Sequence, residues 1–340
     1  MISLAVKYRP KTWDDVCEQG STKTILCQQL ESGEVKNSYL FTGPAGCGKT
    51  TCARIFARDI NNGLGTPIEL DAASNNSVDD VRGIIQQAKM KSLDSEYRVF
   101  IIDECHSLSN SAWQAMLKLI EEPPAKSIFI FCTTDPQKIP KTIISRVQRY
   151  DFQRISLKGI IDRLEYILAA EGNELPIEYD TSAIEYIAKL ADGGMRDSIT
   201  MLDKCLAYNF NLTLENVVAA IGTVAYDTMI DLTSAYLSQD DGESVSIIEG
   251  LYDSGADVKQ FVKSYTQFLL DARKYGVGCD WKYLNLPRMP RYESFMKRML
   301  DNNTFISIGD LLIRMVKLNA DIKYSSTPKY DLEAVFLIRG

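Results

Sequence analysis

Eight consecutive residues are the strongest candidate for chemistry in this chain of 340 residues. Residues 43–50 fit the pattern Gly-x-x-x-x-Gly-Lys-Ser/Thr in full. Glycines let the backbone wrap a polyphosphate, and backbone N–H groups with a following helix N-terminus supply positive potential. Lys49 is expected to reach the β- and γ-phosphates of a nucleotide, and Thr50 to hold Mg²⁺. The residues expected to bind the nucleotide in this loop are Gly43, Pro44, Ala45, Gly46, Cys47, Gly48, Lys49, Thr50 and Thr51.

A second candidate is a pair of acids, Asp103 and Glu104, directly after the apolar run 99–102. Asp103 suits the second Mg²⁺ position, and Glu104 the base that polarises an attacking water. An apolar strand ending in acids is common, so its position after the glycine-rich loop gives the pair its weight. The adjoining His106 is assigned no catalytic role, because a lone histidine beside a metal site is more often a packing or hydrogen-bonding residue.

Three weaker candidates follow along the chain. Thr133 and Thr134 end another apolar run, where a hydroxyl can orient water or simply begin a turn. Arg146 and Arg196 are of the residue type that stabilises charge on a transferred phosphoryl group. From their local sequence alone, surface salt bridges are the more common role for both arginines.

Short apolar runs alternate with helical patterns over residues 1–154, which predicts an α/β domain with a parallel sheet. A helix is expected around Trp113–Ile120 and is stopped by the prolines at 123 and 124. Such strands are buried on both faces, which explains their near-continuous apolar character. The expected strands are Tyr39–Thr42, Ile68–Asp71, Val99–Asp103 and Ile128–Cys132.

The back half has helical periodicity and no convincing strand. One amphipathic helix is expected around Ile184–Ala191 and a longer one around Val258–Ala272. A break near residues 222–223 divides this half. The expected domains are therefore an α/β nucleotide-binding domain (1–154), a small helical lid (155–222) and a helical collar (223–340).

Charge and composition narrow the function classes. The net charge is −7, of which residues 1–154 contribute +1 and residues 155–340 contribute −8. Acidity usually argues against nucleic acid, but here it belongs to the back half. The single histidine and the absence of any Cys-x-x-Cys pair argue against histidine-based metal sites and zinc ribbons. No apolar run is long enough to span a membrane, and a cytoplasmic protein with free thiols is expected.

Six further stretches of the chain match a known pattern together with the glycine-rich loop. They are Lys7-Tyr8-Arg9-Pro10-Lys11-Thr12-Trp13, Asp71-Ala72-Ala73-Ser74-Asn75-Asn76, Leu117-Lys118-Leu119-Ile120-Glu121-Glu122-Pro123-Pro124, Thr133-Thr134-Asp135-Pro136-Gln137-Lys138-Ile139-Pro140, Ile144-Ser145-Arg146 and Gly193-Gly194-Met195-Arg196-Asp197. In this order they resemble the clamp-loader ATPases of the AAA+ class, and among them the gamma/tau family of bacterial DNA polymerase III. The similarity is dense over residues 5–205 and thinner but collinear to about residue 340. Because many motifs occur in the same order, the resemblance is specific.

The resemblance implies roles for single residues. Thr134 corresponds to sensor 1, Arg196 to the sensor 2 arginine of the lid, and Arg146 to an arginine finger that reaches ATP on an adjacent subunit. The remaining correspondences place Tyr8, Arg9 and Pro10 beside the adenine, and Asn75, Asn76 and Ser77 at the contact with duplex phosphates.

The resemblance also implies partners: copies of this chain and other loader subunits in a ring of five, a sliding clamp, and primer–template DNA. Two departures from the family pattern matter. The four-cysteine zinc module is absent, so no zinc is predicted, and Val147 replaces the cysteine after the finger arginine. Two other functions stay open, a helicase or branch-migration motor and a non-catalytic scaffold subunit. Intact Lys49, Asp103, Glu104 and Arg146 favour an active ATPase.

Overall fold

The computed structural model describes residues 2–90, 92, 94–221 and 226–338, and these form two compact units, 1–210 and 211–340. The expected boundary at 222–223 lies outside the described residues. We describe each unit by itself.

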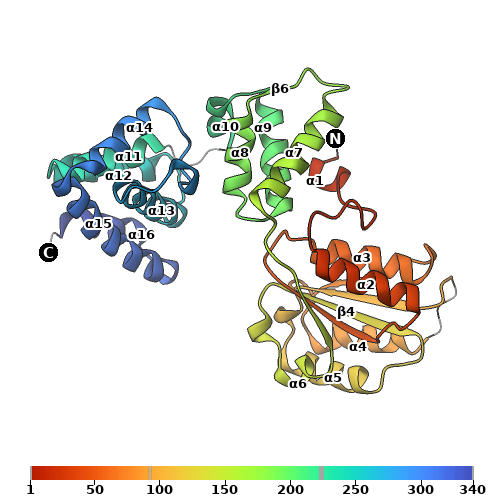
Figure 1. Cartoon of the computed structure of the whole chain (residues 1–340). Helices are drawn as coiled ribbons and strands as arrows, with labels where there is room; N and C mark the ends of the chain where they lie inside the picture. Colours follow the sequence, from red (N-terminus) through yellow and green to blue (C-terminus); the bar gives the residue numbers. More distant parts are fainter. Residues whose placement is uncertain (1, 91, 93, 222–225, 339–340) are drawn as a thin grey trace. The chain divides into compact units, whose positions relative to one another are not determined.

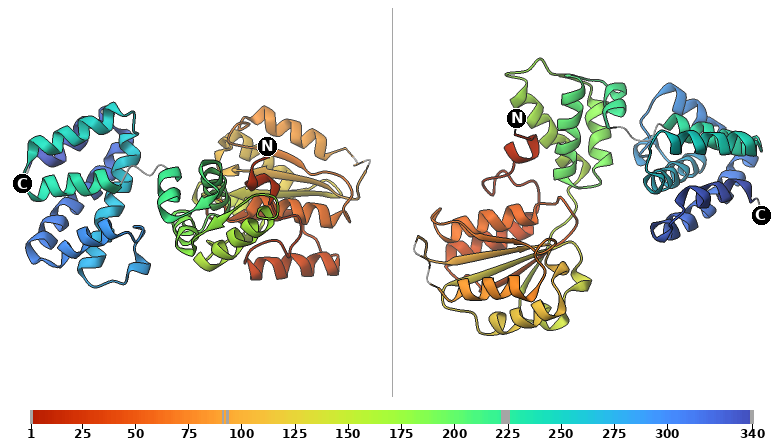
Figure 2. Two further views of the ribbon diagram at one scale, coloured as in Figure 1. Left: turned by 90° about the horizontal axis from the view of Figure 1, so that it is seen from above. Right: turned by 180° about the vertical axis from the view of Figure 1, so that it is seen from behind.

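A parallel five-stranded sheet forms the centre of the first unit (Figures 1 and 2). Its strand order is β2-β3-β4-β1-β5, so consecutive strands are joined by crossover helices. The pairing register brings Thr42 of β1 opposite Thr133 of β4, and Asp71 of β2 opposite Asp103 of β3. The strands are β1 (Ser38–Thr42), β2 (Ile68–Asp71), β3 (Arg98–Asp103), β4 (Ser127–Thr133) and β5 (Gln148–Asp151).

Helices cover both faces of this sheet, with α2 and α3 on one side and α4 and α5 on the other (Figure 1). Alternate side chains of each strand point to opposite faces. Tyr39 and Phe41 therefore pack under α2 and α3, while Leu40 packs under α4 and α5. The helices are α2 (Gly20–Ser32), α3 (Lys49–Ile60), α4 (Val78–Ala88) and α5 (Asn110–Glu121), followed by the short α6 (Lys141–Ile144).

Three further helices, α7, α8 and α9, pack on one another beyond the sheet, and the N-terminal α1 packs on α9. Their bounds are α1 (Leu4–Lys7), α7 (Leu157–Glu171), α8 (Thr181–Leu190) and α9 (Met195–Tyr208). The second unit is helical, with α13 packed on α15 and α12 on α11 and α16. Its helices are α10 (Leu214–Ile221), α11 (Tyr226–Leu237), α12 (Asp241–Asp253), α13 (Val258–Gly276), α14 (Pro290–Lys297), α15 (Asn302–Asp321) and α16 (Pro328–Leu337).

Two expectations about strands were incomplete. β5 reads Gln-Arg-Tyr-Asp and was not predicted, because it is an edge strand in which only Tyr150 is buried. The back half was expected to lack strands, but it contains β6 (Glu178–Tyr179) and β7 (Asn211–Leu212). Two residues are too few to show a period in the sequence. The parallel α/β architecture itself is confirmed.

Candidate nucleotide-binding site

The glycine-rich loop connects β1 to α3, as its sequence predicted. Gly46 and Gly48 have φ values of +71° and +102°, which favour glycine strongly over residues with a Cβ atom. At Gly46 a Cβ atom would also lie 3.0 Å from Cα of Gly194, at the start of α9. Here the N–H of Met195 donates to the carbonyl of Gly46 over 3.1 Å. The conformation of the loop is thus fixed by this contact. Its backbone N–H groups directly precede the N-terminus of α3.

Lys49 lies inside this loop and is only 6% exposed. Its Nζ donates to the carbonyl oxygens of Gly43 at 2.8 Å and Pro44 at 2.7 Å. Burying an ammonium group is costly unless it is hydrogen-bonded. The two carbonyls meet that cost, and they hold the charge within the turn that would surround a phosphate.

Thr50 and Asp103 meet although 53 residues separate them along the chain. The Thr50 hydroxyl donates to Oδ2 of Asp103 over 2.7 Å, because α3 begins beside the carboxyl end of β3. A hydroxyl and a carboxylate are the oxygen ligands that Mg²⁺ takes beside nucleotide phosphates. The pair therefore fits the Mg²⁺ position expected from the sequence.

Glu104 follows Asp103 in a left-handed conformation, with φ of +45°. In this turn the Glu104 N–H donates to Oδ1 of Asp103 over 3.0 Å. Thr134, at the end of the adjacent strand, donates its hydroxyl to Oε2 of Glu104 over 3.0 Å. The structure thus brings the expected base and the expected sensor residue into contact.

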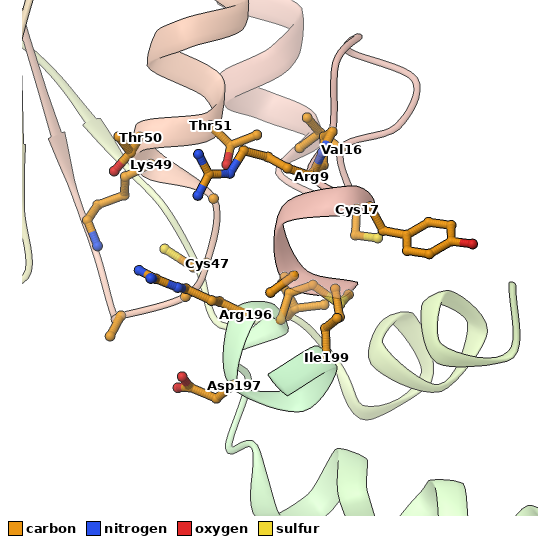
Figure 3. Close-up of a pocket in the computed structure, with 18 of the residues that line it drawn as sticks. Arg9, Val16, Cys17, Cys47, Lys49, Thr50, Thr51, Arg196, Asp197 and Ile199 are labelled. Carbon is orange, nitrogen blue, oxygen red and sulfur yellow. The ribbon is translucent and has the colours of Figure 1, made fainter. Parts of the chain in front are cut away.

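A cavity of about 470 Å³ lies beside the glycine-rich loop and the carboxyl end of β3 in the first unit (Figure 3). Arg196 extends from α9 toward the glycine-rich loop, and Asp197 lies beside it. The volume is in the range of small-molecule sites. Of the residues expected from sequence, those that line the cavity are Tyr8, Arg9, Pro10, Ala45, Gly46, Cys47, Gly48, Lys49, Thr50, Thr51, Asp103, Glu104 and Arg196.

Other lining residues were not expected. Met195 and Ile199 flank Arg196 at a spacing of one helical turn, and that spacing was a usable signal. Asp197 ends the same Gly-Gly-Met-Arg-Asp stretch that contains Arg196. The rest were singled out by no motif. They are Ala5, Asp15, Val16, Cys17, Arg54, Ile155 and Arg163.

Hydrogen bonds join the N-terminal residues 7 and 8 to α7. The Lys7 Nζ donates to Glu171 over 2.6 Å, the Tyr8 hydroxyl binds the same carboxylate, and Arg163 donates to the Tyr8 carbonyl over 2.9 Å. The hydrogen bonds from Lys7 and then Tyr8 lower the pKa of Glu171. Tyr8, Arg9 and Pro10 therefore reach the cavity through contacts that no local motif encodes.

Arg146 does not line this cavity. It follows α6, its side chain is 40% exposed, and its Nε lies 2.8 Å from Oε1 of Glu121. Its Nη1 donates to the Thr142 carbonyl over 2.8 Å. The expected use of Arg146 by a neighbouring subunit remains a prediction.

Asn75, Asn76 and Ser77 lead into α4. Ser77 caps this helix in a capping box, in which its N–H donates to Asp80 over 3.0 Å and its hydroxyl accepts from the Asp80 N–H over 3.3 Å. The Asn75 side chain donates to the Asp71 carbonyl over 3.1 Å. Because the first turn of α4 also carries Asp79, any phosphate contact here depends on the preceding residues, and the DNA site stays a prediction.

The cysteines are all free thiols. Burial raises the pKa of Cys52, behind the loop, to about 12, so this thiol is neutral. Within the part of the chain that the structure describes, no three His, Cys, Asp or Glu side chains are grouped as metal ligands. No described helix is both long and apolar enough to cross a bilayer.

Comparison with known proteins gives two family matches. Residues 66–156 match the family described as "DNA polymerase III, delta subunit". Residues 159–210 match "DNA polymerase III clamp loader subunit, ATPase lid domain". The second match falls within the region expected from the sequence to be a lid.

Individual relatives cover more of the chain. It is 34% identical to the DNA polymerase III subunit tau of Bacillus subtilis, over 96% of this chain and 61% of that protein. It is also 34% identical to the tau subunit of Escherichia coli, over 71% of this chain and 40% of that protein. This chain thus spans less than two thirds of either relative.

A similar solved structure is the RuvB Holliday junction branch migration motor of Thermotoga maritima. Its TM-score is 0.53, at 22% identity, over 67% of this chain and 79% of that one. At this identity the similarity establishes the fold alone, which is the AAA+ fold expected from the sequence.

Proposed function

Because this chain is a relative of the tau and gamma/tau subunits of bacterial DNA polymerase III, as its sequence predicted, we propose that it is the ATP-hydrolysing subunit of a clamp loader. Such a subunit opens a sliding clamp and loads it onto primer–template DNA. The observation that carries the ATPase part is the contact between Thr50 and Asp103 beside the buried Lys49. A hydroxyl, a carboxylate and an ammonium group in a glycine-rich loop form a site for a nucleotide with Mg²⁺.

The chain's own residues divide the work. Lys49 and the loop N–H groups hold the phosphates, and Thr50 with Asp103 holds Mg²⁺, which neutralises phosphate charge when bound. Glu104 takes the proton of the attacking water. Tyr8, Arg9 and Pro10 receive the base, and Arg196 faces the loop from α9 (Figure 3).

The finger arginine belongs to a neighbouring subunit in this proposal. Arg146 lies outside the cavity of its own chain, so hydrolysis requires a second subunit that offers its Arg146. This supports a ring that contains further copies of the chain, with primer–template DNA near Asn75, Asn76 and Ser77. Loading clamps during replication would place the protein in the cytoplasm. The similarity to RuvB does not favour a branch-migration motor, because it extends only to the fold.

The test is to mix two inactive variants. Lys49→Ala weakens nucleotide binding but leaves Arg146, whereas Arg146→Ala keeps the loop but loses the finger. Each alone should hydrolyse ATP at least about 1,000-fold more slowly than wild type with primed DNA and clamp. A mixture should recover part of the activity at junctions where an intact loop meets an intact finger.

Arg149→Ala is the matched control, since Arg149 is a nearby arginine of similar exposure that is paired with Asp151 over 2.8 Å. It should retain wild-type hydrolysis. If Arg146→Ala alone keeps full activity, the shared site is wrong. Strand separation without clamp loading would instead establish a helicase.

A further inference from the structure

His106, the single histidine of the chain, contacts the carboxylate expected to act as base. Its Nδ1 lies 3.3 Å from Oε2 of Glu104 and 3.2 Å from Oγ1 of Thr133. The Thr134 hydroxyl approaches the same Oε2 from β4. Two elements, the 3₁₀ turn Cys105–Ser107 and the end of β4, thus converge on one oxygen of Glu104.

The chemistry of these partners determines which histidine nitrogen carries hydrogen. An ionised carboxylate only accepts hydrogen bonds, so Nδ1 must be protonated to make a favourable contact with Oε2. Thr133 Oγ1 accepts from the Asp135 N–H over 3.0 Å and has a second lone pair to accept from Nδ1. Both neighbours of Nδ1 are therefore compatible with the Nδ1–H form.

The other carboxylate oxygen of Glu104, Oε1, differs from Oε2 in its hydrogen bonding. Among the described residues, none donates a hydrogen bond to Oε1. Glu104 lines the cavity, whereas His106 and Thr134 do not. The imidazole is also more shielded than the carboxylate, with 18% of its side chain exposed against 36%. His106 thus lies behind Glu104 as seen from the cavity.

We infer that His106 is a positioning residue for Glu104: its Nδ1–H, 3.3 Å from Oε2, attracts that oxygen while the Thr134 hydroxyl hydrogen-bonds it, and this leaves Oε1 as the atom that accepts the proton of the attacking water. The inference rests on the proposed ATPase function. It gives His106 no contact with nucleotide or water. A positioning role differs from a packing role in one respect. It requires a hydrogen-bond donor at the Nδ1 position, whereas a packing role requires only a side chain of similar size.

Three substitutions separate position from bulk. His106→Asn places an amide N–H near the Nδ1 position, His106→Gln places it farther out near Nε2, and His106→Leu keeps similar bulk without a donor. Leu and Gln should lower kcat roughly tenfold with KM for ATP changed less than about twofold, because the base is misdirected while the phosphate site is intact. Asn should restore kcat to within about twofold of wild type.

A packing role gives a different result. If Asn, Gln and Leu lower kcat equally, or none changes it, the inference is overturned. Thermal unfolding of each variant identifies a loss caused by misfolding. Should all three variants misfold, the unmodified protein provides an independent test.

That test uses the single histidine. In protein labelled with ¹⁵N-histidine, nuclear magnetic resonance reports one imidazole, and its shifts distinguish the two neutral tautomers. The Nδ1–H form is expected. An imidazole protonated only at Nε2 would mean that Thr133 donates to Nδ1 and that Glu104 receives nothing, which overturns the inference.

Glu104→Gln separates this inference from the proposed function. It should bind ATP but hydrolyse it about 100-fold or more slowly. Full hydrolysis by Glu104→Gln would refute the base itself, whatever His106 does. If Glu104→Gln is slow and adding His106→Leu slows it tenfold further, His106 acts by another route and the positioning role fails.

Discussion

Residues 1–210 and residues 211–340 each contain an aspartate that accepts hydrogen bonds from other segments, Asp103 and Asp271, yet the two carboxylates have different roles. Asp103 lies at the carboxyl edge of a sheet, accepts from the Thr50 hydroxyl and from the N–H of the next residue, and lines a cavity. Asp271 on α13 is nearly fully buried and accepts from the Asn285 N–H over 2.7 Å and from Gln267 and Lys274. Asp271 holds the segment after α13 in place through its hydrogen bonds, whereas Asp103 retains acceptor lone pairs that a ligand can use.

The surroundings explain this contrast. In the helical unit, Phe261, Tyr265 and Phe268 stack along α13 with ring centroids 5.5 and 6.1 Å apart. A close-packed helical core leaves polar groups no role except mutual pairing. In the sheet unit, parallel strands end together at one edge, so their terminal polar residues face a common space. A hydrogen-bonded carboxylate therefore indicates chemistry only where the fold leaves it open to a cavity.

The largest expected effect tests two lysines, one from each unit. Lys49→Ala should weaken the binding of a fluorescent ATP analogue about 100-fold or more, because it removes charged hydrogen bonds to phosphate. Lys274→Ala should leave this affinity within about twofold. Equilibrium titration measures both, and equal losses in the two variants would contradict the assignment of the site to residues 1–210.

For the free energy of unfolding, we expect the larger effect from the substitution of Lys274 rather than of Lys49. Lys274 lies 3.2 Å from Asp271, and its removal leaves the buried carboxylate with the neutral donors Gln267 and the Asn285 N–H. Lys274→Ala should cost roughly 1–2 kcal/mol of unfolding free energy. Hydrogen exchange read by mass spectrometry should rise in peptides from 211–340 and not in those from 1–210. A rise confined to the sheet would refute the role given to this pair.

The smallest effect concerns pH, and the two units should respond with opposite signs. Hydrogen bonds from Lys7 and Tyr8 lower the pKa of Glu171 from 4.5, so its contribution to stability exists above pH 4.5 and is lost as pH falls through the lower folded-state pKa. Burial raises the pKa of Asp271 from 3.8, so its contribution exists below pH 3.8 and is lost as pH rises through the higher folded-state value.

Urea unfolding of wild type, Glu171→Gln and Asp271→Asn between pH 7 and pH 3.5 measures these contributions. The advantage of wild type over Glu171→Gln should shrink on acidification. The balance between wild type and Asp271→Asn should shift toward wild type. Parallel shifts for the two variants would contradict the opposite pKa directions.

Much of the nucleotide site could be predicted because its signals are local. The loop needs glycines, a lysine and a threonine in succession, and the acids directly follow a buried strand. The predicted strands agree with the structure to within about one residue. Three of them, β1, β3 and β4, are buried on both faces and are continuous apolar runs, whereas the edge strand β2 alternates apolar and acidic residues. β5 gave no such signal because an edge strand tolerates polar residues.

Other parts of the site had no local signal. Arg163 reaches the carbonyl of Tyr8 across 155 positions of sequence, and Val16 and Ile155 line the cavity without any motif. Such residues are selected by the packing of α7 and α9 around the N-terminal segment. Sequence periodicity reports which face of a helix is buried but not what that face meets.

By itself the sequence determined the chemistry on offer in this protein: a phosphate-binding loop, two acids after a strand, and a resemblance to clamp-loader ATPases. Tertiary structure alone decided which groups meet. It joined Thr50 to Asp103, gave Arg146 the surface partner Glu121, and placed His106 behind Glu104. The physical reason is range, because backbone preferences and motifs act over a few residues, whereas a hydrogen bond depends on where folding brings two distant atoms.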